Sequence, residues 1–461
     1  MPLIDPKDPR HVHFMGIAGA GMSALAELCV RRGTVVTGCD NNPDGAGDLM
    51  RLGIAAQRGH DVQHLEGHRA LVVTSAIPKD HPEIARAHAL GIPVIRRAEA
   101  LAEATSGGDR LVAVAGTHGK STTTVMVTEA LKGAAIDATG VVGARVRSWN
   151  GNLSAGADQV FVVEADEYDR SFLALQPQVA VVTNIEADHL DIYKDLDDIR
   201  ATFATFAARA RWLVICADDH WANLLPSPPT AEVIRYGIAS PDARMVAKNI
   251  SSADGGSAFD VVFDGKEVGR VVLSVPGAHN VRNALAAIAV GVGSWGASVE
   301  MLARGLSNFR GVERRFERLG DGAGVTVVDD YAHHPTEIHA TLAAARLAFP
   351  GRRIIAAFQP HLFSRTKDFA GEFAEALTAA DGCWLADIYP AREQPVPGVT
   401  SGLIADAMTT SGKSPAWTGP RAEMAAALAA STRSGDVVLT IGAGDVTKTG
   451  PELLARLRAQ A

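Results

Sequence analysis

Short apolar runs alternate with amphipathic stretches along nearly the whole chain. This alternation predicts β-strands followed by α-helices, and therefore parallel sheets covered by helices. The expected strands are residues 11–15, 34–38, 70–75, 92–95, 111–115, 160–164, 179–184, 212–216, 325–328, 353–358, 382–388 and 436–441. The expected helices are residues 22–32, 82–90, 120–131, 196–209, 280–292, 299–307, 335–348 and 369–378.

The pattern is interrupted in ways that suggest domain limits. Residues 104–109 are polar and rich in glycine, as in a linker, and residues 241–275 are short, strand-like and suited to a small antiparallel patch. At 461 residues the chain is too long for one hydrophobic core. The prediction is three consecutive α/β domains, namely 1–108, 109–312 and 313–461.

Composition narrows the class of protein. Apolar residues make up 47% of the chain and charged residues 21%, which is typical of a globular enzyme. The net charge of −8 gives no basic field for nucleic acid, so local cations and backbone amides must hold an anionic ligand. No apolar run is long enough to cross a bilayer, and no signal pattern opens the chain. The four scattered cysteines indicate reduced thiols in a cytoplasmic protein: Cys29, Cys39, Cys216 and Cys383.

The strongest chemical signal lies between an expected strand and an expected helix. It reads Gly116-Thr117-His118-Gly119-Lys120-Ser121-Thr122. Glycines let backbone N–H groups face phosphate oxygens, and the helix N-terminus adds a positive dipole end. Lys120 is expected to neutralise ATP phosphates, contacting ligand rather than core, and Ser121 to bind Mg²⁺. The common P-loop would have glycine at Val114, so a structural turn with an incidental lysine is the alternative.

Acidic residues follow two of the expected strands. The segments are Glu164-Ala165-Asp166-Glu167 and Asn184-Ile185-Glu186-Ala187-Asp188-His189. Ligands of open α/β sheets bind at the carboxyl ends of the strands. A carboxylate and an imidazole that converge there suit a Mg²⁺ ion bridging the nucleotide and a second anionic substrate. The alternative is that these residues are helix caps or solvated turns.

A second glycine-rich turn opens the chain's first helix. Gly16, Gly19 and Gly21 bring backbone close to a helix N-terminus, which suits a diphosphate, and Asp40 ends the next strand where a ribose contact is expected. A purely structural turn is one alternative. An NAD-dependent oxidoreductase is another, although it leaves the Gly116–Thr122 segment unexplained. A nucleotide-binding switch without chemistry is disfavoured by the many polar residues at strand ends.

The third predicted domain carries two more polar strand ends. They read Asp329-Asp330-Tyr331-Ala332-His333-His334-Pro335 and Phe358-Gln359-Pro360-His361-Leu362-Phe363-Ser364-Arg365. Paired histidines in a polar loop after a strand indicate a site more often than a core. Before them lies a basic segment, residues 310–316, which is either a functional hinge or a solvated linker.

Taken together, these segments resemble the Mur ligases, the ATP-dependent amide-forming enzymes of peptidoglycan precursor synthesis. The resemblance covers residues 16–21, 116–124, 164–169, 184–191, 279–283, 314–316, 329–337 and 360–366, in the family's order. It implies an N-terminal Rossmann-like domain for the UDP group, a central P-loop ATPase-like domain, and a C-terminal Rossmann-like domain for the amino acid.

The resemblance also implies roles for single residues. ATP would contact Gly116 to Thr122, Asn280, Asn283, Arg315 and Asp330. Mg²⁺ would be held by Ser121, Glu164 and His189. The UDP-sugar would contact Gly16, Gly19, Gly21, Asp40 and Ser75. The amino acid would contact Tyr331, His361 and Arg365, and the catalytic set would be Lys120, His189, His333, His361 and Arg365.

The implied reaction joins L-alanine to the carboxylate of UDP-N-acetylmuramate through an acyl phosphate, giving ADP and phosphate. Partners would be these small molecules, with the chain a monomer or weak homodimer and with no nucleic acid or membrane. Leu362 stands where many alanine-adding members have an arginine, which leaves Arg365 to hold the substrate carboxylate, and Ser121 replaces a commoner threonine. Several sister ligases have a carbamylated lysine near residues 198–203, where this chain has none, which favours the alanine-adding branch. A branch that adds an intact tripeptide is the nearest alternative.

Overall fold

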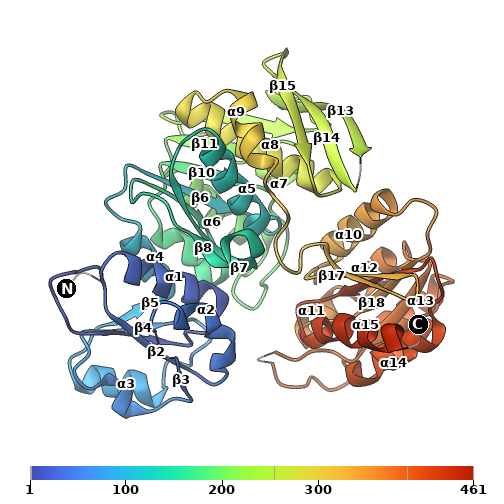
Figure 1. Cartoon of the computed structure of the whole chain (residues 1–461), viewed down its shortest axis with the longest axis horizontal. Helices are drawn as coiled ribbons and strands as arrows, with labels where there is room; N and C mark the ends of the chain where they lie inside the picture. Colours follow the sequence, from blue (N-terminus) through green and yellow to red (C-terminus); the bar gives the residue numbers. More distant parts are fainter. Residues whose placement is uncertain (1–2, 55, 254, 392, 460–461) are drawn as a thin grey trace. The chain divides into compact units, whose positions relative to one another are not determined.

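The computed structural model describes residues 3–54, 56–253, 255–391 and 393–459. Three sheets with covering helices follow one another along the chain, as the sequence predicted (Figure 1). Backbone contacts divide the chain into two compact units. One comprises residues 1–250, 258–272 and 281–310, and the other comprises residues 251–257, 273–280 and 311–461. Each unit is described by itself.

The first sheet has five strands in the order β3-β2-β1-β4-β5, and every neighbouring pair is parallel. Alternate residues of β1 face opposite sides. Val12 and Phe14 pack in the same core as α1 and α4, whereas Met15 packs in a separate cluster with α3. The bounds are β1 Val12–Met15, α1 Ala20–Arg31, β2 Val36–Asp40, α2 Gly47–Met50, β3 Ala56–Arg58, β4 Ala70–Val73, α3 Pro82–Ala89, β5 Val94–Arg96 and α4 Arg97–Ala104.

The second sheet has ten strands in the order β15-β14-β13-β12-β11-β10-β6-β9-β7-β8. β6 is parallel to β9 on one side and to β10 on the other, so the carboxyl ends of these three strands share one edge. The strands are β6 Arg110–Ala115, β7 Ala138–Val146, β8 Gly151–Ser154, β9 Val160–Glu164, β10 Val179–Val182, β11 Trp212–Cys216, β12 Glu232–Gly237, β13 Met245–Ala253, β14 Gly256–Phe263 and β15 Lys266–Leu273. The helices are α5 Lys120–Gly133, α6 Leu196–Ala207, α7 His220–Asn223, α8 Ala278–Trp295 and α9 Val299–Leu306.

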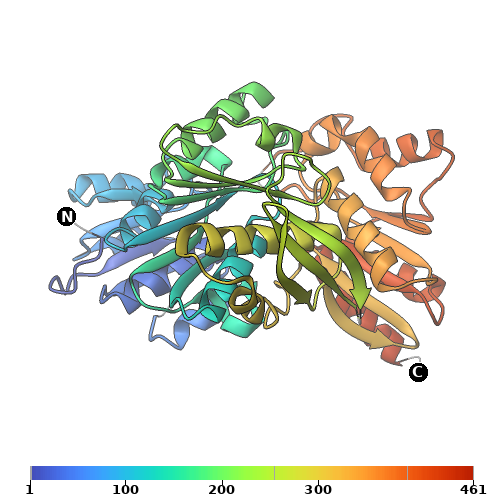
Figure 2. The ribbon, with the colours of Figure 1, turned by 90° about the horizontal axis from the view of Figure 1, so that it is seen from above.

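The third sheet has six strands in the order β16-β17-β21-β18-β19-β20, with β16 antiparallel to β17 and the other pairs parallel. In β18, Ile354 and Phe358 pack with α10, α12 and α13, whereas Ile355 packs with α14 and α15 on the other face. The strands are β16 Glu317–Gly322, β17 Val325–Asp330, β18 Ile354–Phe358, β19 Gly382–Ala386, β20 Trp417–Gly419 and β21 Val437–Ile441. The helices are α10 Pro335–Ala348, α11 Phe363–Asp368, α12 Ala370–Leu377, α13 Gly402–Thr410, α14 Arg421–Ser431 and α15 Thr449–Ala459 (Figure 2).

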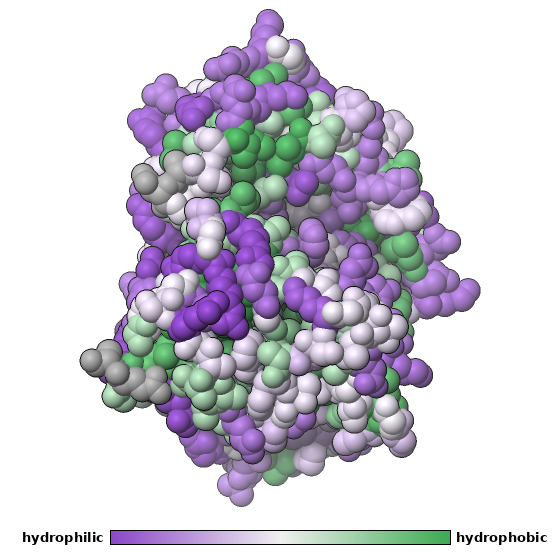
Figure 3. All heavy atoms as spheres, turned by 90° about the vertical axis from the view of Figure 1, so that its right-hand side faces the viewer, coloured by the Kyte–Doolittle hydropathy of each residue, from purple (hydrophilic) through white to green (hydrophobic). Residues whose placement is uncertain are grey.

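Surface and cysteine features also bear on the sequence predictions. Among the described residues, no helix is long and apolar enough to span a bilayer. On the face shown in Figure 3, hydrophilic and hydrophobic residues are interspersed. All four cysteines are free and buried, as expected for reduced thiols.

Candidate active site

The phosphate loop follows β6 and is shaped by two glycines. Gly116 has a φ of +140°, and a Cβ there would collide with the Thr183 hydroxyl at the end of β10. Gly119 has a φ of +82° and is the N-cap of α5. Both positions therefore need glycine, and the loop ends at the N-terminus of a 14-residue helix.

Asn184, directly after β10, fixes the loop against the neighbouring strand. Its side-chain oxygen accepts from the His118 N–H at 2.7 Å, and its amide nitrogen donates to the His118 carbonyl at 3.0 Å. The Thr117 N–H donates to the Asn184 carbonyl at 3.1 Å, and the Thr117 hydroxyl accepts from the Glu186 N–H at 2.9 Å. Hydrogen bonds to the segment that follows β10 therefore fix the conformation of the loop.

Lys120 lies in the loop with a buried carboxylate beside it. Its Nζ donates to the carbonyls of Gly116 and Thr117 at 2.7 and 3.1 Å and to Glu167 Oε1 at 2.9 Å. Burial opposes the charge on Lys120, but the carboxylate of Glu167, supported by Asp166, raises the pKa of Lys120 above its ordinary value. Burial likewise opposes ionisation of Glu167, but Lys120 and His189 hold its pKa below its ordinary value. The sequence predicted that Lys120 contacts ligand rather than core, and the structure shows that it also pairs with this buried glutamate.

Ser121 and Glu164 form the set of oxygens best suited to Mg²⁺. The Ser121 hydroxyl lies 3.0 Å from both carboxylate oxygens of Glu164. The Gly143 N–H donates to Glu164 Oε2 at 2.8 Å and holds the carboxylate in place. Hard oxygen donors next to a phosphate loop are the ligands that Mg²⁺ prefers, so the residues fit the ion.

His189 lies with the lysine–glutamate pair. Its Nε2 is 3.7 Å from Glu167 Oε1 and 3.8 Å from Asp188 Oδ2, and its backbone has a φ of +54°. Burial lowers the pKa of His189, but contact with Glu167 and Asp188 outweighs it and raises the pKa above its ordinary value. The three predicted Mg²⁺ ligands are therefore divided between two contacts. Ser121 contacts Glu164, whereas His189 contacts Glu167.

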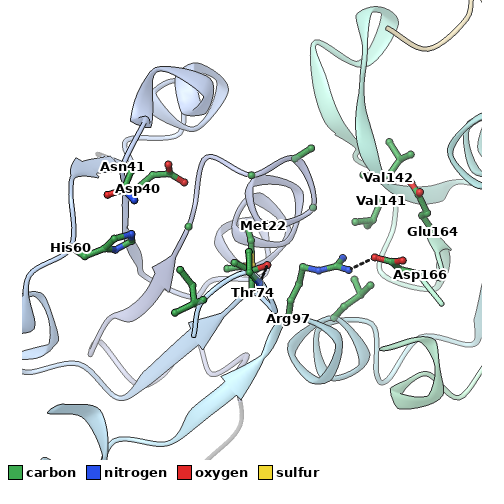
Figure 4. Close-up of a pocket in the computed structure, with 18 residues that line it drawn as sticks. Met22, Asp40, Asn41, His60, Thr74, Arg97, Val141, Val142, Glu164 and Asp166 are labelled. Atoms are coloured by element: carbon green, nitrogen blue, oxygen red, sulfur yellow. Dashed lines mark hydrogen bonds and ion pairs between the residues drawn. The ribbon is translucent and has the colours of Figure 1, made fainter. Parts of the chain in front are cut away.

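A pocket of about 610 Å³ runs from the glycine-rich turn at Gly16, Gly19 and Gly21 to Glu164 (Figure 4). Asp40 lies at its wall, and its Oδ2 accepts from the Ala18 N–H at 3.1 Å. Across the pocket, Arg97 Nη2 is 3.0 Å from Asp166 Oδ2. Other lining residues come from the turn between β1 and α1, from α1, from the segments after β2, β3 and β4, and from β7; they include Gly16, Gly19, Gly21, Asn41, His60, Thr74, Ala76, Val141, Val142 and Gly143. Ser75 is exposed and does not line the pocket, although both its neighbours do.

The two asparagines of α8 are both buried. Asn283 lies beside the phosphate loop, because a Cβ at Gly119 would come 3.0 Å from its side-chain oxygen. Asn280 belongs to the other compact unit, where its side-chain nitrogen donates to the Pro276 carbonyl at 2.7 Å.

In the C-terminal unit, polar residues gather where β17 and β18 end. Asp330 is buried and accepts from the N–H groups of Phe316 and Ala332, each at 2.8 Å. Burial raises the pKa of Asp330 to about 6, although Arg315 and the backbone donors oppose the shift. The ion pair formed by Arg315 is with Glu337, at 3.3 Å, and its guanidinium lies 5.1 Å from the Tyr331 ring.

The histidines of this unit are also brought together. The His333 and His361 rings are 5.9 Å apart, and the His361 ring stacks on Tyr389 at 5.8 Å. Arg365 is buried on α11, only 6% exposed. Leu362, at the N-cap of this helix, has a φ of +72°, a strained backbone of the kind found at functional sites.

The residue predictions missed several groups that the structure places at these sites. Asn184 and Glu167 stood inside motifs noted at the strand ends, but only packing shows that one positions the loop and the other pairs with Lys120. Arg97 gave no signal, because it is an ordinary charged residue at the start of a helix until the sheet topology brings it to the pocket. Glu337 ends the noted segment 329–337, but only the structure shows that it pairs with Arg315.

Comparison with known proteins gives matches along the whole chain. Three models of Mur ligase domains match it: the Mur ligase family catalytic domain over residues 11–108, the middle domain over 114–291 and the glutamate ligase domain over 314–444. The UDP-N-acetylmuramate–L-alanine ligase of Cutibacterium acnes is 44% identical, over 100% of this chain and 98% of that protein.

Two solved structures are similar over almost their full length. The UDP-N-acetylmuramate–alanine ligase of Thermotoga maritima superposes with a TM-score of 0.83 at 29% identity, covering 98% of this chain and 100% of that one. A murein peptide ligase of Psychrobacter arcticus superposes with a TM-score of 0.72 at 26% identity, covering 97% and 99%.

Proposed function

The chain belongs to the Mur ligase family, and from that premise we propose that it joins L-alanine to the carboxylate of UDP-N-acetylmuramate at the expense of ATP. The products are UDP-N-acetylmuramoyl-L-alanine, ADP and phosphate. The full-length relative from Cutibacterium acnes carries this activity in its name, and so does the Thermotoga maritima structure.

The observation that carries the proposal is that Glu164 lies both beside the phosphate loop and at the wall of the pocket. Its carboxylate accepts from Ser121 of the phosphate loop and also lines the pocket that begins at Gly16. A nucleotide phosphate on the loop and an acid in the pocket therefore approach the same carboxylate. This is the arrangement needed to transfer a phosphoryl group from ATP to a substrate carboxylate.

Activation of the acid comes first, because a carboxylate is a poor electrophile. The γ-phosphorus forms a bond to a carboxylate oxygen while its bond to the β-phosphate oxygen breaks and ADP leaves. Lys120, held in the loop by Glu167, faces the charge that develops on the transferring group. The neutral amine of alanine then attacks the acyl carbon, the nitrogen loses one proton to solvent, and the bond from the acyl carbon to the phosphate oxygen breaks so that phosphate leaves.

We assign Ser121, Glu164 and His189 as the residues that hold Mg²⁺ when ATP is bound. The ion supplies charge neutralisation for the phosphate oxygens. Glu167 orients Lys120 and contacts His189, and so joins the loop to the proposed metal ligands. The pKa of His189 is raised, so its imidazole holds a proton up to a higher pH. It must lose that proton before it can bind a cation.

We further propose a division of labour among three domains. Residues 1–108 take the UDP-sugar, residues 109–312 take ATP, and residues 313–461 take the amino acid. The spans of the three family models support these limits. In the third domain we assign Tyr331, His333, His361 and Arg365 to the alanine site, and Arg315 and Asp330 to the nucleotide.

Addition of an intact tripeptide is a second candidate, since the chain is also similar to a murein peptide ligase. The higher TM-score and identity of the alanine ligase structure favour alanine. Since ATP and UDP-sugars are cytoplasmic metabolites, we place the reaction in the cytoplasm, with the chain acting as a monomer or weak homodimer.

The direct test is to incubate the purified chain with ATP, Mg²⁺, UDP-N-acetylmuramate and L-alanine and to weigh the product by mass spectrometry. We expect a product heavier than the sugar acid by one alanine minus water, with one ADP formed per product. Each substrate is omitted in turn as a control. ADP formation without an alanine adduct would contradict the proposal.

A further inference from the structure

A cluster of metal-ligating side chains is buried in the first domain, on the face of the first sheet that α3 covers. His13 comes from β1, Cys39 from β2, His64 from the short helix Val62–Leu65, and Glu83 from α3. His13, Cys39 and Glu83 are fully buried among the apolar residues of that face. None of the four is used in the proposed reaction.

Three spacings among the four donor atoms are close to those of a tetrahedral site. His13 Nε2 lies 3.3 Å from Cys39 Sγ, Sγ lies 3.8 Å from Glu83 Oε1, and His64 Nδ1 lies 3.2 Å from the same oxygen. All four donors lie within 4.8 Å of one another. Zinc bonds of about 2.0–2.3 Å in a tetrahedron place neighbouring donors about 3.3–3.6 Å apart, which is close to these distances.

Hydrogen bonds join Cys39 to His13 and to Glu83 within the cluster, but they supply no positive charge. A fully buried carboxylate is costly unless a positive charge compensates it. Among the described residues, the ion pairs of Glu83 are with His60 and His64 only, and these are cationic only when protonated. His64 Nδ1 is buried, and although Glu83 is near, it makes no well-aligned hydrogen bond.

The surroundings of the cluster resemble the outer shell of a metal site. His13 Nδ1 is 2.8 Å from the Thr37 hydroxyl, which orients the ring so that Nε2 faces the cluster. The Asp61 N–H donates to Glu83 Oε1 at 2.8 Å. Hydrogen bonds of this kind to the ligands are the usual accompaniment of metal-binding histidines and carboxylates. His60 lies at the edge, 3.2 Å from Cys39 Sγ, and also lines the substrate pocket, which gives an ion a path of entry.

We propose that His13 Nε2, Cys39 Sγ, His64 Nδ1 and one oxygen of Glu83 bind a divalent transition-metal ion, with zinc as the best match. Two imidazoles, one thiolate and one carboxylate form the mixed nitrogen, sulfur and oxygen set that zinc takes in tetrahedral sites. On binding, the thiol releases its proton to solvent, and the two anionic donors then balance the charge of the ion. The ion would link β1, β2, the short helix Val62–Leu65 and α3. Asp40, the last residue of β2, and His60, just before the short helix, line the pocket.

Cobalt(II) is the probe that tests this site, since it replaces zinc in tetrahedral sites and is coloured. The full-length protein, stripped with a chelator, is titrated with Co²⁺ in excess Mg²⁺, and zinc is then added. We expect a thiolate-to-cobalt charge-transfer band and intense tetrahedral d–d bands that saturate at one equivalent and are lost on adding zinc. Cobalt at Ser121 and Glu164 would give no thiolate band, because sulfur is absent there.

Variants assign the signal to the cluster. Cys39→Ser should abolish the thiolate band, and His64→Ala, at a half-buried position, should weaken cobalt binding by about 100-fold or more. Cys29→Ser, a buried cysteine of the same domain, and His11→Ala, an exposed neighbour, are the matched controls and should leave the titration unchanged. The proposal is overturned if the wild-type protein shows no thiolate band, or if the band persists in Cys39→Ser.

Discussion

Lys120 and Glu167 form a buried ion pair at the base of the phosphate loop, with Nζ 2.8 Å from Oε2. The side chain of Glu167 is 3% exposed and that of Lys120 is 14% exposed. Contacts within the protein therefore place the lysine, and its position depends on a residue 47 positions away in the chain. This pair links the fold of the loop to its chemistry.

Replacing Lys120 with alanine should lower kcat by about 10²-fold or more, since it removes a charge aimed at the transferring phosphoryl group. It should also destabilise the first unit by about 3 kcal/mol, because among the described residues Glu167 keeps His189 alone as an ion-pair partner. Urea unfolding and steady-state kinetics measure the two effects separately.

The double variant Lys120→Ala/Glu167→Gln is the control for the stability effect. Removing the unpaired charge should restore much of the stability and none of the turnover. A double variant no more stable than Lys120→Ala would show that the pair does not matter for folding.

His189 should make the Mg²⁺ requirement depend on pH. Contact with Glu167 and Asp188 raises its pKa above the ordinary value of 6.5, against the effect of burial. A protonated imidazole cannot bind a cation, so the half-saturating Mg²⁺ concentration should fall as pH rises through that raised pKa. In His189→Ala the half-saturating Mg²⁺ concentration should be higher and should no longer depend on pH in this way. Binding of the UDP-sugar should be nearly intact. His88→Ala, at an exposed position, is the control, and an unmoved Mg²⁺ curve in His189→Ala would make His189 structural.

Asp330 should contribute a pH-dependent loss of stability. Burial raises its folded-state pKa to about 6 from an ordinary 3.8, so between these values the folded state holds one proton that the unfolded state lacks. Stability from this group is therefore greatest below pH 3.8 and falls as pH rises to about 6, by about 1.4 kcal/mol per pH unit. Asp330→Asn should lack this slope in urea unfolding, and Asp406→Asn, at an exposed position, should keep it. Equal slopes for Asp330→Asn and wild type would refute the assignment.

Arg365 should carry most of the binding energy for the alanine carboxylate. Alanine offers little apolar surface, and Leu362 supplies no second guanidinium beside His361. A charge-assisted contact contributes roughly 1.5–3 kcal/mol, so Arg365→Ala should raise the KM for alanine by about 10- to 150-fold. The KM values for ATP and UDP-N-acetylmuramate should change much less.

Arg365→Lys is the matched variant for this prediction. It should recover only part of the loss, since a point charge does not reproduce the planar fork of the guanidinium. Equal KM increases for all three substrates would instead show that Arg365 acts through the fold. This outcome needs to be distinguished because Arg365 is buried.

Regular elements were predictable where periodicity and length agreed. The strands Val160–Glu164 and Trp212–Cys216 and the helix Pro335–Ala348 have the predicted bounds, because a continuous apolar run or a proline at the first helical position marks their limits. The hairpin of β7 and β8 was not predicted, because residues 138–154 carry glycines and polar residues that give no clear alternation. That hairpin supplies Val141, Val142 and Gly143 to the pocket.

The site was predictable as a set of strand ends and not as a set of contacts. Gly116, Gly119 and Lys120 stand in a local motif that can be recognised from the sequence alone. The pairing of Lys120 with Glu167, and the contacts that Asn184 makes with the loop, join residues 47 and 66 positions apart. These depend on β6 lying between β9 and β10, an order that periodicity alone does not give.

The measurement that tests the account most directly is a comparison of acceptors. ADP release is followed with ATP, Mg²⁺ and UDP-N-acetylmuramate fixed, while L-alanine or the L-alanyl-γ-D-glutamyl-meso-diaminopimelate tripeptide is varied. The account predicts turnover that depends on L-alanine, with a kcat/KM for alanine well above that for the tripeptide. A higher kcat/KM for the tripeptide, or ADP release indifferent to both, would contradict it.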